Sequence, residues 1–255
     1  MSIFKPMIIR WIIFVVPTIV GTADGVVGAN LKNEIVPSIS TTVSSQDGRN
    51  RPHNYKILKD EIKYTGWRQI IRRTVLAPPR PHHGEKVIEF DIIDQSKSRN
   101  DLENSSRAVI VFAWNSSTKT ATLIREYMPA CHRILNGLAA GIVEGDKHED
   151  DLVAARFELE EECHLGGGTW HRLTEEGISV PMDKYVVTEV TPYLVIDPCH
   201  VPDPRPLDDE EDIEIIHGVT EEEIRQMIRE GDMNLVSAWA CLLALDRLRE
   251  LGEIK

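Results

Sequence analysis

Residues 155–168 read ARFELEEECHLGGG and place four glutamates, Glu158, Glu160, Glu161 and Glu162, within five positions. Carboxylates at this density repel one another, so the segment is either a solvated helix face or a site for a cation. In a helix, Glu158, Glu161 and Glu162 have the spacing i, i+3 and i+4 and share one face. Oxygen ligands of this kind suit Mg²⁺ or Mn²⁺. Glu160 points to another side, where we expect it to be solvated.

The composition indicates a globular protein that does not bind nucleic acid. The chain has 255 residues, 42% of them hydrophobic, and a formal net charge of −12. This length fits one large domain or two small ones. A phosphate backbone requires lysine and arginine, so the acidic balance argues against nucleic acid as a partner. It does not exclude a phosphorylated small molecule, because a cation can bridge an acidic protein and an anionic ligand.

The four cysteines are widely spaced, at Cys131, Cys163, Cys199 and Cys241, and form no CxxC pair. This spacing argues against a zinc site and against a disulfide framework. We expect four buried thiols, with a single disulfide as the alternative.

The N-terminal residues resemble a targeting segment. Lys5 and Arg10 precede the apolar run WIIFVVPTIV at residues 11–20, and small residues follow. This order predicts a signal peptide at residues 1–29, or a signal anchor as the alternative. It implies the secretory pathway or secretion, or else membrane anchoring or an organelle, with membrane contact only through this segment. Residues 30–54 are polar and predict a disordered linker, so the folded domain is expected at residues 55–255.

In residues 55–255, some segments have the apolar spacing typical of strands and others the spacing typical of helices. Strands are predicted at residues 55–64, 67–76, 86–94, 107–115, 120–128, 137–144, 184–196 and 213–219. Helices are predicted at residues 150–165, 220–231 and 234–252. The order is strands, one helix, strands and two helices, which predicts an α+β fold around a mixed sheet.

The segment before the glutamates leads directly into the predicted helix. Residues 124–145 read IREYMPACHRILNGLAAGIVEG, and the small residues Ala139, Ala140 and Gly141 allow the backbone to approach a cation or phosphate. Together with the acidic helix, this segment resembles the Nudix hydrolase family, and within it the group of ADP-ribose and ADP-sugar pyrophosphatases. The sequence box of that family is G-x5-E-x7-R-E-U-x-E-E-x-G-U, where U is aliphatic.

The metal-binding half of the box is present. Glu158, Leu159, Glu161 and Glu162 match E-U-x-E-E, and Leu165 matches the closing aliphatic residue. Outside the box, REYMP at residues 125–129, LAAG at residues 138–141 and LDDEEDIEI at residues 207–215 are similar to segments of the same group. The resemblance extends from about residue 55 to the end.

The other half of the box departs from the family pattern. Seven residues separate Gly141 from Glu149, where the family has five. Phe157 stands in the place of the arginine, which in the family helps to hold a metal-binding glutamate and the loop, so we expect a looser site. His164 stands in the place of the last glycine, and we expect Gly166 to end the helix instead.

The resemblance implies a Nudix fold, with a mixed sheet between helices and N-terminal strands that pair across a homodimer, for which residues 67–75 would serve. It implies a hydrolase that uses Mg²⁺ or Mn²⁺ and cleaves a nucleoside diphosphate linked to another group. ADP-ribose or an ADP-sugar is the first expected substrate, giving AMP and a sugar phosphate. The alternatives are another substrate, such as a capped nucleotide or coenzyme A, and a catalytically weak module that binds a nucleotide or a protein.

The resemblance also implies roles for individual residues. Glu158, Glu161, Glu162 and the carbonyl of Ala140 would hold the metal. Arg125, Tyr127, Ala140 and Gly141 would bind substrate, and Glu210 or Glu211 would act as a base or further ligand. For the last pair a solvated acidic loop is the alternative, and for Arg125 the alternative is an ion pair with Glu126.

Overall fold

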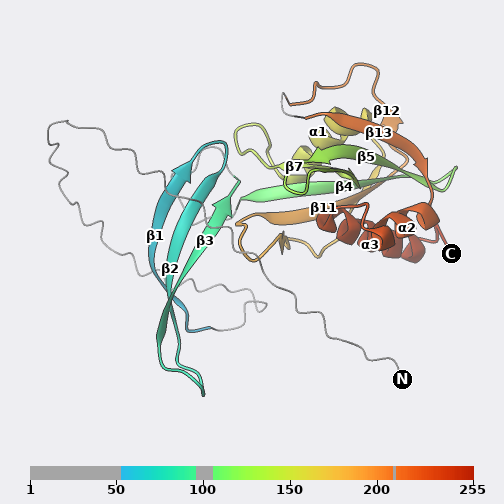
Figure 1. The fold of residues 1–255 in the computed structure, drawn as a ribbon. Helices are drawn as coiled ribbons and strands as arrows, with labels where there is room; N and C mark the ends of the chain where they lie inside the picture. The colour runs from blue at the N-terminus through green and yellow to red at the C-terminus, as the bar shows by residue number, and fades with distance from the viewer. Residues whose placement is uncertain (1–52, 96–105, 209–210) are drawn as a thin grey trace, which may run out of the picture. The chain divides into compact units, whose positions relative to one another are not determined.

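The computed structural model describes residues 53–95, 106–208 and 211–255 (Figure 1). The predicted leader, nearly all of the predicted linker, and Glu210 lie outside these ranges. Among the helices of the described ranges, none has the length and apolar character needed to cross a membrane.

The first described strands form a separate three-stranded antiparallel sheet. They are β1 (Lys56–Thr65), β2 (Gln69–Ala77) and β3 (Lys86–Asp94), with β2 in the centre. Ile93 of β3 donates its N–H to the carbonyl of Tyr185 at 2.7 Å and accepts from the N–H of Val187 at 2.9 Å. These two backbone hydrogen bonds attach β3 to the segment that precedes β11.

The remaining main strands form an eight-stranded mixed sheet. The strand order is β10-β11-β4-β5-β13. Three further strands pair with members of this series: β6 with β5, β7 with β4 and β9 with β11. Only the β11–β4 pair is parallel among these pairings of the described strands. The bounds are β4 (Arg107–Asn115), β5 (Thr120–Met128), β6 (Arg133–Gly137), β7 (Ala139–Ile142), β9 (Thr169–Arg172), β10 (Val180–Pro181), β11 (Glu189–Ile196) and β13 (Ile213–Val219). The short strands β8 (Leu165–Gly166) and β12 (Cys199–His200) pair with each other.

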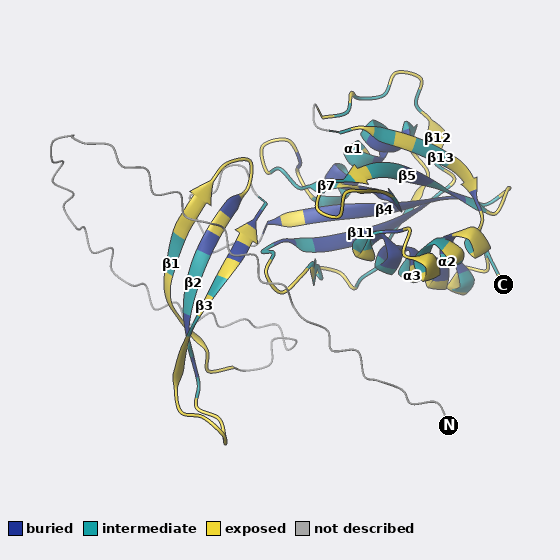
Figure 2. Ribbon diagram, viewed as in Figure 1, coloured by how far each residue is buried: buried dark blue, intermediate teal, exposed yellow. Residues whose placement is uncertain are grey.

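Helices cover both faces of this sheet. They are α1 (Asp151–Cys163), α2 (Glu221–Glu230) and α3 (Leu235–Glu250). On one face Val109 and Val111 of β4 pack with Leu159 of α1, and on the other Ile110 and Phe112 pack with buried residues of α3. Figure 2 shows β4 buried along nearly its whole length. Burial on both faces explains its continuous apolar sequence.

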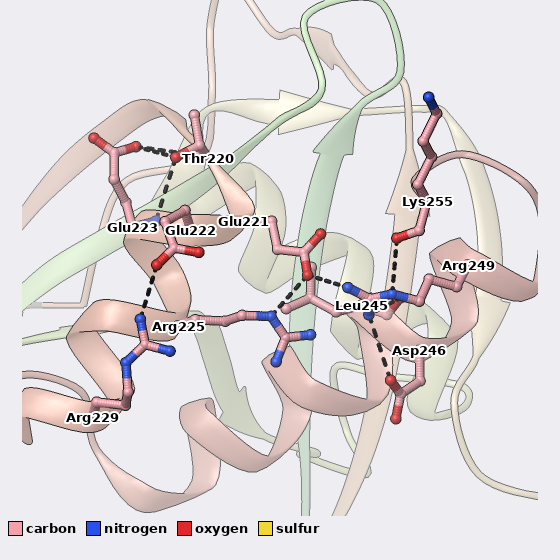
Figure 3. A network of polar contacts seen from close by, with 10 residues as sticks. All are labelled: Thr220, Glu221, Glu222, Glu223, Arg225, Arg229, Leu245, Asp246, Arg249 and Lys255. Atoms are coloured by element: carbon pink, nitrogen blue, oxygen red, sulfur yellow. Dashed lines mark hydrogen bonds and ion pairs between the residues drawn. The ribbon is translucent and has the colours of Figure 1, made fainter.

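A carboxylate joins the last two helices (Figure 3). Thr220 begins α2 with a capping box, as predicted from Glu223 three residues later. Glu221 accepts hydrogen bonds from Arg225, within α2, and from Arg249, on α3. This shared acceptor fastens α2 to α3, whose apolar face covers the sheet.

Three expectations need correction. The strand expected at residues 137–144 is the shorter β7, and a strand that was not predicted, β6, precedes it; β6 pairs with β5 and β7 with β4, so the chain changes partner at Leu138. Gly166 does not end α1: His164 is the C-cap and adopts the left-handed conformation itself, with φ 56°. Only Cys163 and Cys241 are buried, whereas Cys131 and Cys199 are exposed, and all four thiols are free.

Candidate functional site

The glutamates of α1 lie beside the strand β7. Asp150 begins the helix by accepting a hydrogen bond from the N–H of Val153 at 2.8 Å. Ala155 and Leu159 are fully buried against the sheet in the same cluster as Ala139 of β7. This packing fixes the rotation of α1, so that Glu162 reaches the β7 backbone.

Glu162 is the most deeply buried of the predicted metal ligands, with 3% of its surface exposed. Its Oε2 accepts a hydrogen bond from the N–H of Ala140 at 3.0 Å. Burial, followed by the charges of Glu158 and Glu211, raises the pKa of Glu162 well above its usual range. A bound cation would relieve both effects, because it supplies the positive charge that the buried carboxylate lacks.

Glu158 lies directly against Gly141. A Cβ built on Gly141 would overlap the Glu158 carboxylate, so the glycine is required here for space. Burial raises the pKa of Glu158 to about 8, and the charges of Glu161, Glu211 and other acids act in the same direction. The opening glycine of the box and its first helical glutamate are therefore in contact, although the loop between them is longer than in the family.

Glu161 and Glu160 both lie next to Arg205, which is contributed by the loop before β13. Burial raises the pKa of Glu161, and the charge of Arg205, whose Nε is 3.9 Å from Glu161 Oε1, opposes that rise. Arg205 Nη1 donates to Glu160 Oε2 at 2.6 Å. The expectation that Glu160 is solvated is therefore wrong, because this ion pair connects it to a distant loop.

The acidic loop reaches the same site. Ile213 of β13 packs against the buried cluster that holds Leu159 of α1, and the charge of Glu211, two residues before it, raises the pKa of Glu158, Glu161 and Glu162. Glu211 Oε2 accepts from the N–H of Asp208 at 3.1 Å, and its own N–H donates to the Asp208 carbonyl at 3.0 Å. Glu210, the other predicted base, lies outside the described residues.

Phe157, which replaces the box arginine, packs between two loops. The edge of the His148 ring approaches it at 5.2 Å between centroids, and the Arg205 guanidinium lies 3.7 Å from its centroid. His148 is buried, and its Nδ1 accepts from the N–H of Glu144 at 3.0 Å. The aromatic ring thus contacts both the box loop and the acidic loop, so the loosening expected from the missing arginine is opposed by new contacts.

Two residues predicted to bind substrate lie on the face of the sheet opposite α1. Residues alternate along β5, so Arg125 and Tyr127 point away from the face that carries Ile124 and α1. Arg125 pairs with Glu214 at 2.8 Å, and Tyr127 Oη lies 2.7 Å from His132 Nδ1. The structure does not bring them together with the glutamates, and their binding role stays a prediction.

Glu126, considered earlier only as an ion-pair partner of Arg125, belongs instead to the glutamate side of β5. The pairing of Arg125 with Glu214 shows that the alternative ion pair with Glu126 is wrong. Burial raises the pKa of Glu126, and its charge in turn raises the pKa of Glu162. The alternation of β5 could have revealed this position, whereas no local pattern points to Arg205.

The donor chemistry at α1 fits a hard divalent cation. Its carboxylates are poorly solvated and crowd one another, and the exposed Ala140 adjoins them. Across residues 53–95, 106–208 and 211–255, no three His, Cys, Asp or Glu side chains converge closely enough to share one ion. Glu162 accepts from the N–H of Ala140 instead, so ligation by Glu162 would require its side chain to rotate.

Comparison with known proteins identifies the fold. No family model matches the chain, and no curated protein matches it in sequence. A solved structure described as an ADP compounds hydrolase is similar to it, with a TM-score of 0.60, 18% sequence identity, and coverage of 78% of this chain and 97% of that one. At this identity the likeness concerns the fold. It confirms the predicted α+β class, with a mixed sheet between helices.

Proposed function

We propose that this chain is a divalent-metal-dependent hydrolase of a nucleoside diphosphate linked to another group, with ADP-ribose or an ADP-sugar as the first candidate substrate. The observation that carries the proposal is the contact of Glu158 and Glu162 with Gly141 and Ala140, with Glu161 on the same helix face. The sequence resemblance to ADP-ribose and ADP-sugar pyrophosphatases supports the substrate class, and the solved neighbour is named for hydrolysis of ADP compounds.

Each residue has a distinct task in the proposed reaction. A bound Mg²⁺ or Mn²⁺ supplies the Lewis acidity that offsets the charge of the diphosphate. Glu158, Glu161, Glu162 and the Ala140 carbonyl would hold it. Glu211 would accept a proton from the attacking water as that water bonds to phosphorus and the bond to the bridging oxygen breaks. Gly141 keeps the space that the Glu158 carboxylate occupies.

The test is release of AMP from ADP-ribose with Mg²⁺ or Mn²⁺. We expect Glu161→Gln and Glu162→Gln to abolish release, because the amide removes a charged ligand while keeping the size of the side chain. Glu222→Gln is the matched control, since Glu222 is exposed on α2 and pairs only with Arg229 among the ion pairs described. A folded protein that releases no AMP from ADP-ribose or a wider nucleotide panel would contradict the proposal.

The second candidate is a Nudix-fold module that binds its ligand without turnover. Phe157 in place of the box arginine and the longer loop after Gly141 favour it. Calorimetry separates the two candidates, because the module would bind ADP-ribose and leave it intact, whereas the hydrolase would convert it.

We also propose that the three-stranded sheet pairs with a second copy of the chain. Its strands correspond to the N-terminal strands that the resemblance implies at a homodimer interface. Tyr64, Ile70 and Ile93 stand opposite one another in β1, β2 and β3 and are 59%, 37% and 37% exposed. A contiguous row of exposed apolar side chains supports pairing with a second copy through this sheet.

The location of the protein is a further proposal. The leader expected at residues 1–29 would direct the chain into the secretory pathway. N-terminal sequencing of the mature protein tests this, because a cleaved signal peptide leaves a new terminus near residue 30.

A further inference from the structure

The two prolines beside Arg205 restrict its backbone conformation, independently of its side-chain contacts. It stands between Pro204 and Pro206 in the acidic loop. Proline fixes its own φ, and a residue that precedes proline is confined to extended conformations. At the start of the loop, the N–H of Val201 donates to the carbonyl of His164 at 2.9 Å, which attaches the loop to the end of α1. The backbone at Arg205 therefore has little conformational freedom where it faces α1.

Arg205 contacts several α1 side chains at once. Its Nη1 donates to Glu160 Oε2 at 2.6 Å, and its backbone N–H donates to Glu160 Oε1 at 3.3 Å. Its Nε lies 3.9 Å from Glu161 Oε1, and its guanidinium stacks 3.7 Å from the Phe157 centroid. A planar guanidinium can stack and pair at the same time, which a lysine ammonium cannot do. This combination is more specific than an ordinary surface ion pair.

The loop continues from Arg205 to the proposed base. Asp208, three residues on, exchanges two hydrogen bonds with Glu211, at 3.0 and 3.1 Å. Glu211 stands two residues before Ile213, which packs against the same buried cluster as Leu159 of α1. Contacts of Arg205 with α1 therefore restrict where Glu211 can lie.

We propose that Arg205 is a positioning residue that fastens residues 201–208 to α1 and, through Asp208, holds Glu211 at the glutamate site. The fastening stands on the contacts alone, whereas its effect on turnover rests on the proposed hydrolase function. Arg205 affects turnover by positioning Glu211 and not by contacting substrate.

Amide hydrogen exchange of the full chain tests the fastening without any turnover. In Arg205→Ala the hydrogen-bonded amides of Val201 and Asp208 should exchange at least about tenfold faster, because the loop opens locally. Arg205→Lys should give an intermediate rate, since it keeps the charge and loses the stacking. Arg229→Ala is the control, as Arg229 forms an exposed pair with Glu222 on α2. Unchanged exchange in Arg205→Ala would overturn the proposal.

A double-mutant cycle tests the action through Glu211. Arg205→Ala should lower kcat about tenfold or more with little change in KM, because a displaced base impairs the chemical step. In a Glu211→Gln background the same change should have no further effect on kcat. Losses that multiply in the double variant would show that Arg205 does not act through Glu211. Absence of turnover in the unmodified protein would refute the hydrolase function and leave the exchange test intact.

Discussion

Gly141 shows how a single residue makes room for the proposed metal ligands. In Gly141→Ala the new Cβ overlaps the Glu158 carboxylate, so that side chain must move away from β7. We expect stability to fall by ~1–3 kcal/mol, as for other overpacked sites. Affinity for Mn²⁺ should fall about tenfold or more, because a displaced carboxylate no longer points at the site. Thermal unfolding and calorimetric titration with Mn²⁺ measure the two effects.

Gly145→Ala is the matched control for this change. Gly145 lies in the turn that follows β7, and a Cβ there would meet nothing within 4 Å. We expect both its stability and its Mn²⁺ affinity to match the unmodified protein. If Gly141→Ala also matched it, the close approach of Glu158 to Gly141 would be irrelevant to the site.

The buried charge of Glu158 predicts a dependence of stability on pH. Burial raises its pKa from 4.5 to about 8 in the folded protein, so the folded state holds a proton that the unfolded state releases. The stabilisation is complete below pH 4.5 and is lost as the pH rises towards 8. Between pH 5 and 8, in the presence of a chelator, the loss from this group should be at most ~4 kcal/mol.

Urea unfolding of the unmodified protein and of Glu158→Gln tests this prediction. The amide does not ionise, so the variant should lose less stability across the same pH range. Saturating Mn²⁺ should reverse the trend in the unmodified protein, because a cation favours the deprotonated carboxylate. Parallel pH profiles for the two proteins would show that Glu158 is not desolvated in the folded state.

At the scale of the element, the end of α1 is less favourable than the end of α2. Both C-caps are left-handed, but His164 carries a Cβ in this conformation and Gly231 does not. We expect His164→Gly to raise the free energy of unfolding by ~0.5–1 kcal/mol, and Gly231→Ala to lower it by about 1 kcal/mol. Urea denaturation measures both. Destabilisation by His164→Gly would instead show that the imidazole makes contacts that outweigh the strain.

The elements also show which features can be read from sequence. The spacing of Ala155, Leu159 and Cys163 predicted α1 correctly, because a helix buries one face. The strand β6 at Arg133–Gly137, and the change of partner between it and β7, were missed, because a change of strand partner leaves no mark on apolar periodicity. Arg205 was missed because its partner Glu160 is 45 residues away in the chain, and long-range pairs have no local signature. Glu211 was expected at the site only through the resemblance, because no local pattern connects it to α1.

At the scale of the whole molecule, the two sheets differ in how they are covered. In the eight-stranded sheet, α1 and α3 cover opposite faces of β4, which is buried from Ala108 to Trp114. The three-stranded sheet exposes Tyr64, Ile70 and Ile93 side by side. A helix-covered sheet is complete within one chain, whereas an apolar cross-strand row in solvent is stabilised when a partner covers it.

This difference predicts a homodimer that one charge can dissociate. In Ile70→Glu the carboxylate stands between Tyr64 and Ile93 in the middle of the row, so pairing would bury an uncompensated charge. We expect the unmodified protein to have the mass of a dimer by light scattering at micromolar concentration, and Ile70→Glu to have that of a monomer. Leu235→Glu is the control, because Leu235 is 81% exposed at the start of α3, and a glutamate suits a helix N-terminus. A monomeric unmodified protein, or dissociation by Leu235→Glu alone, would place any pairing surface elsewhere than on the three-stranded sheet.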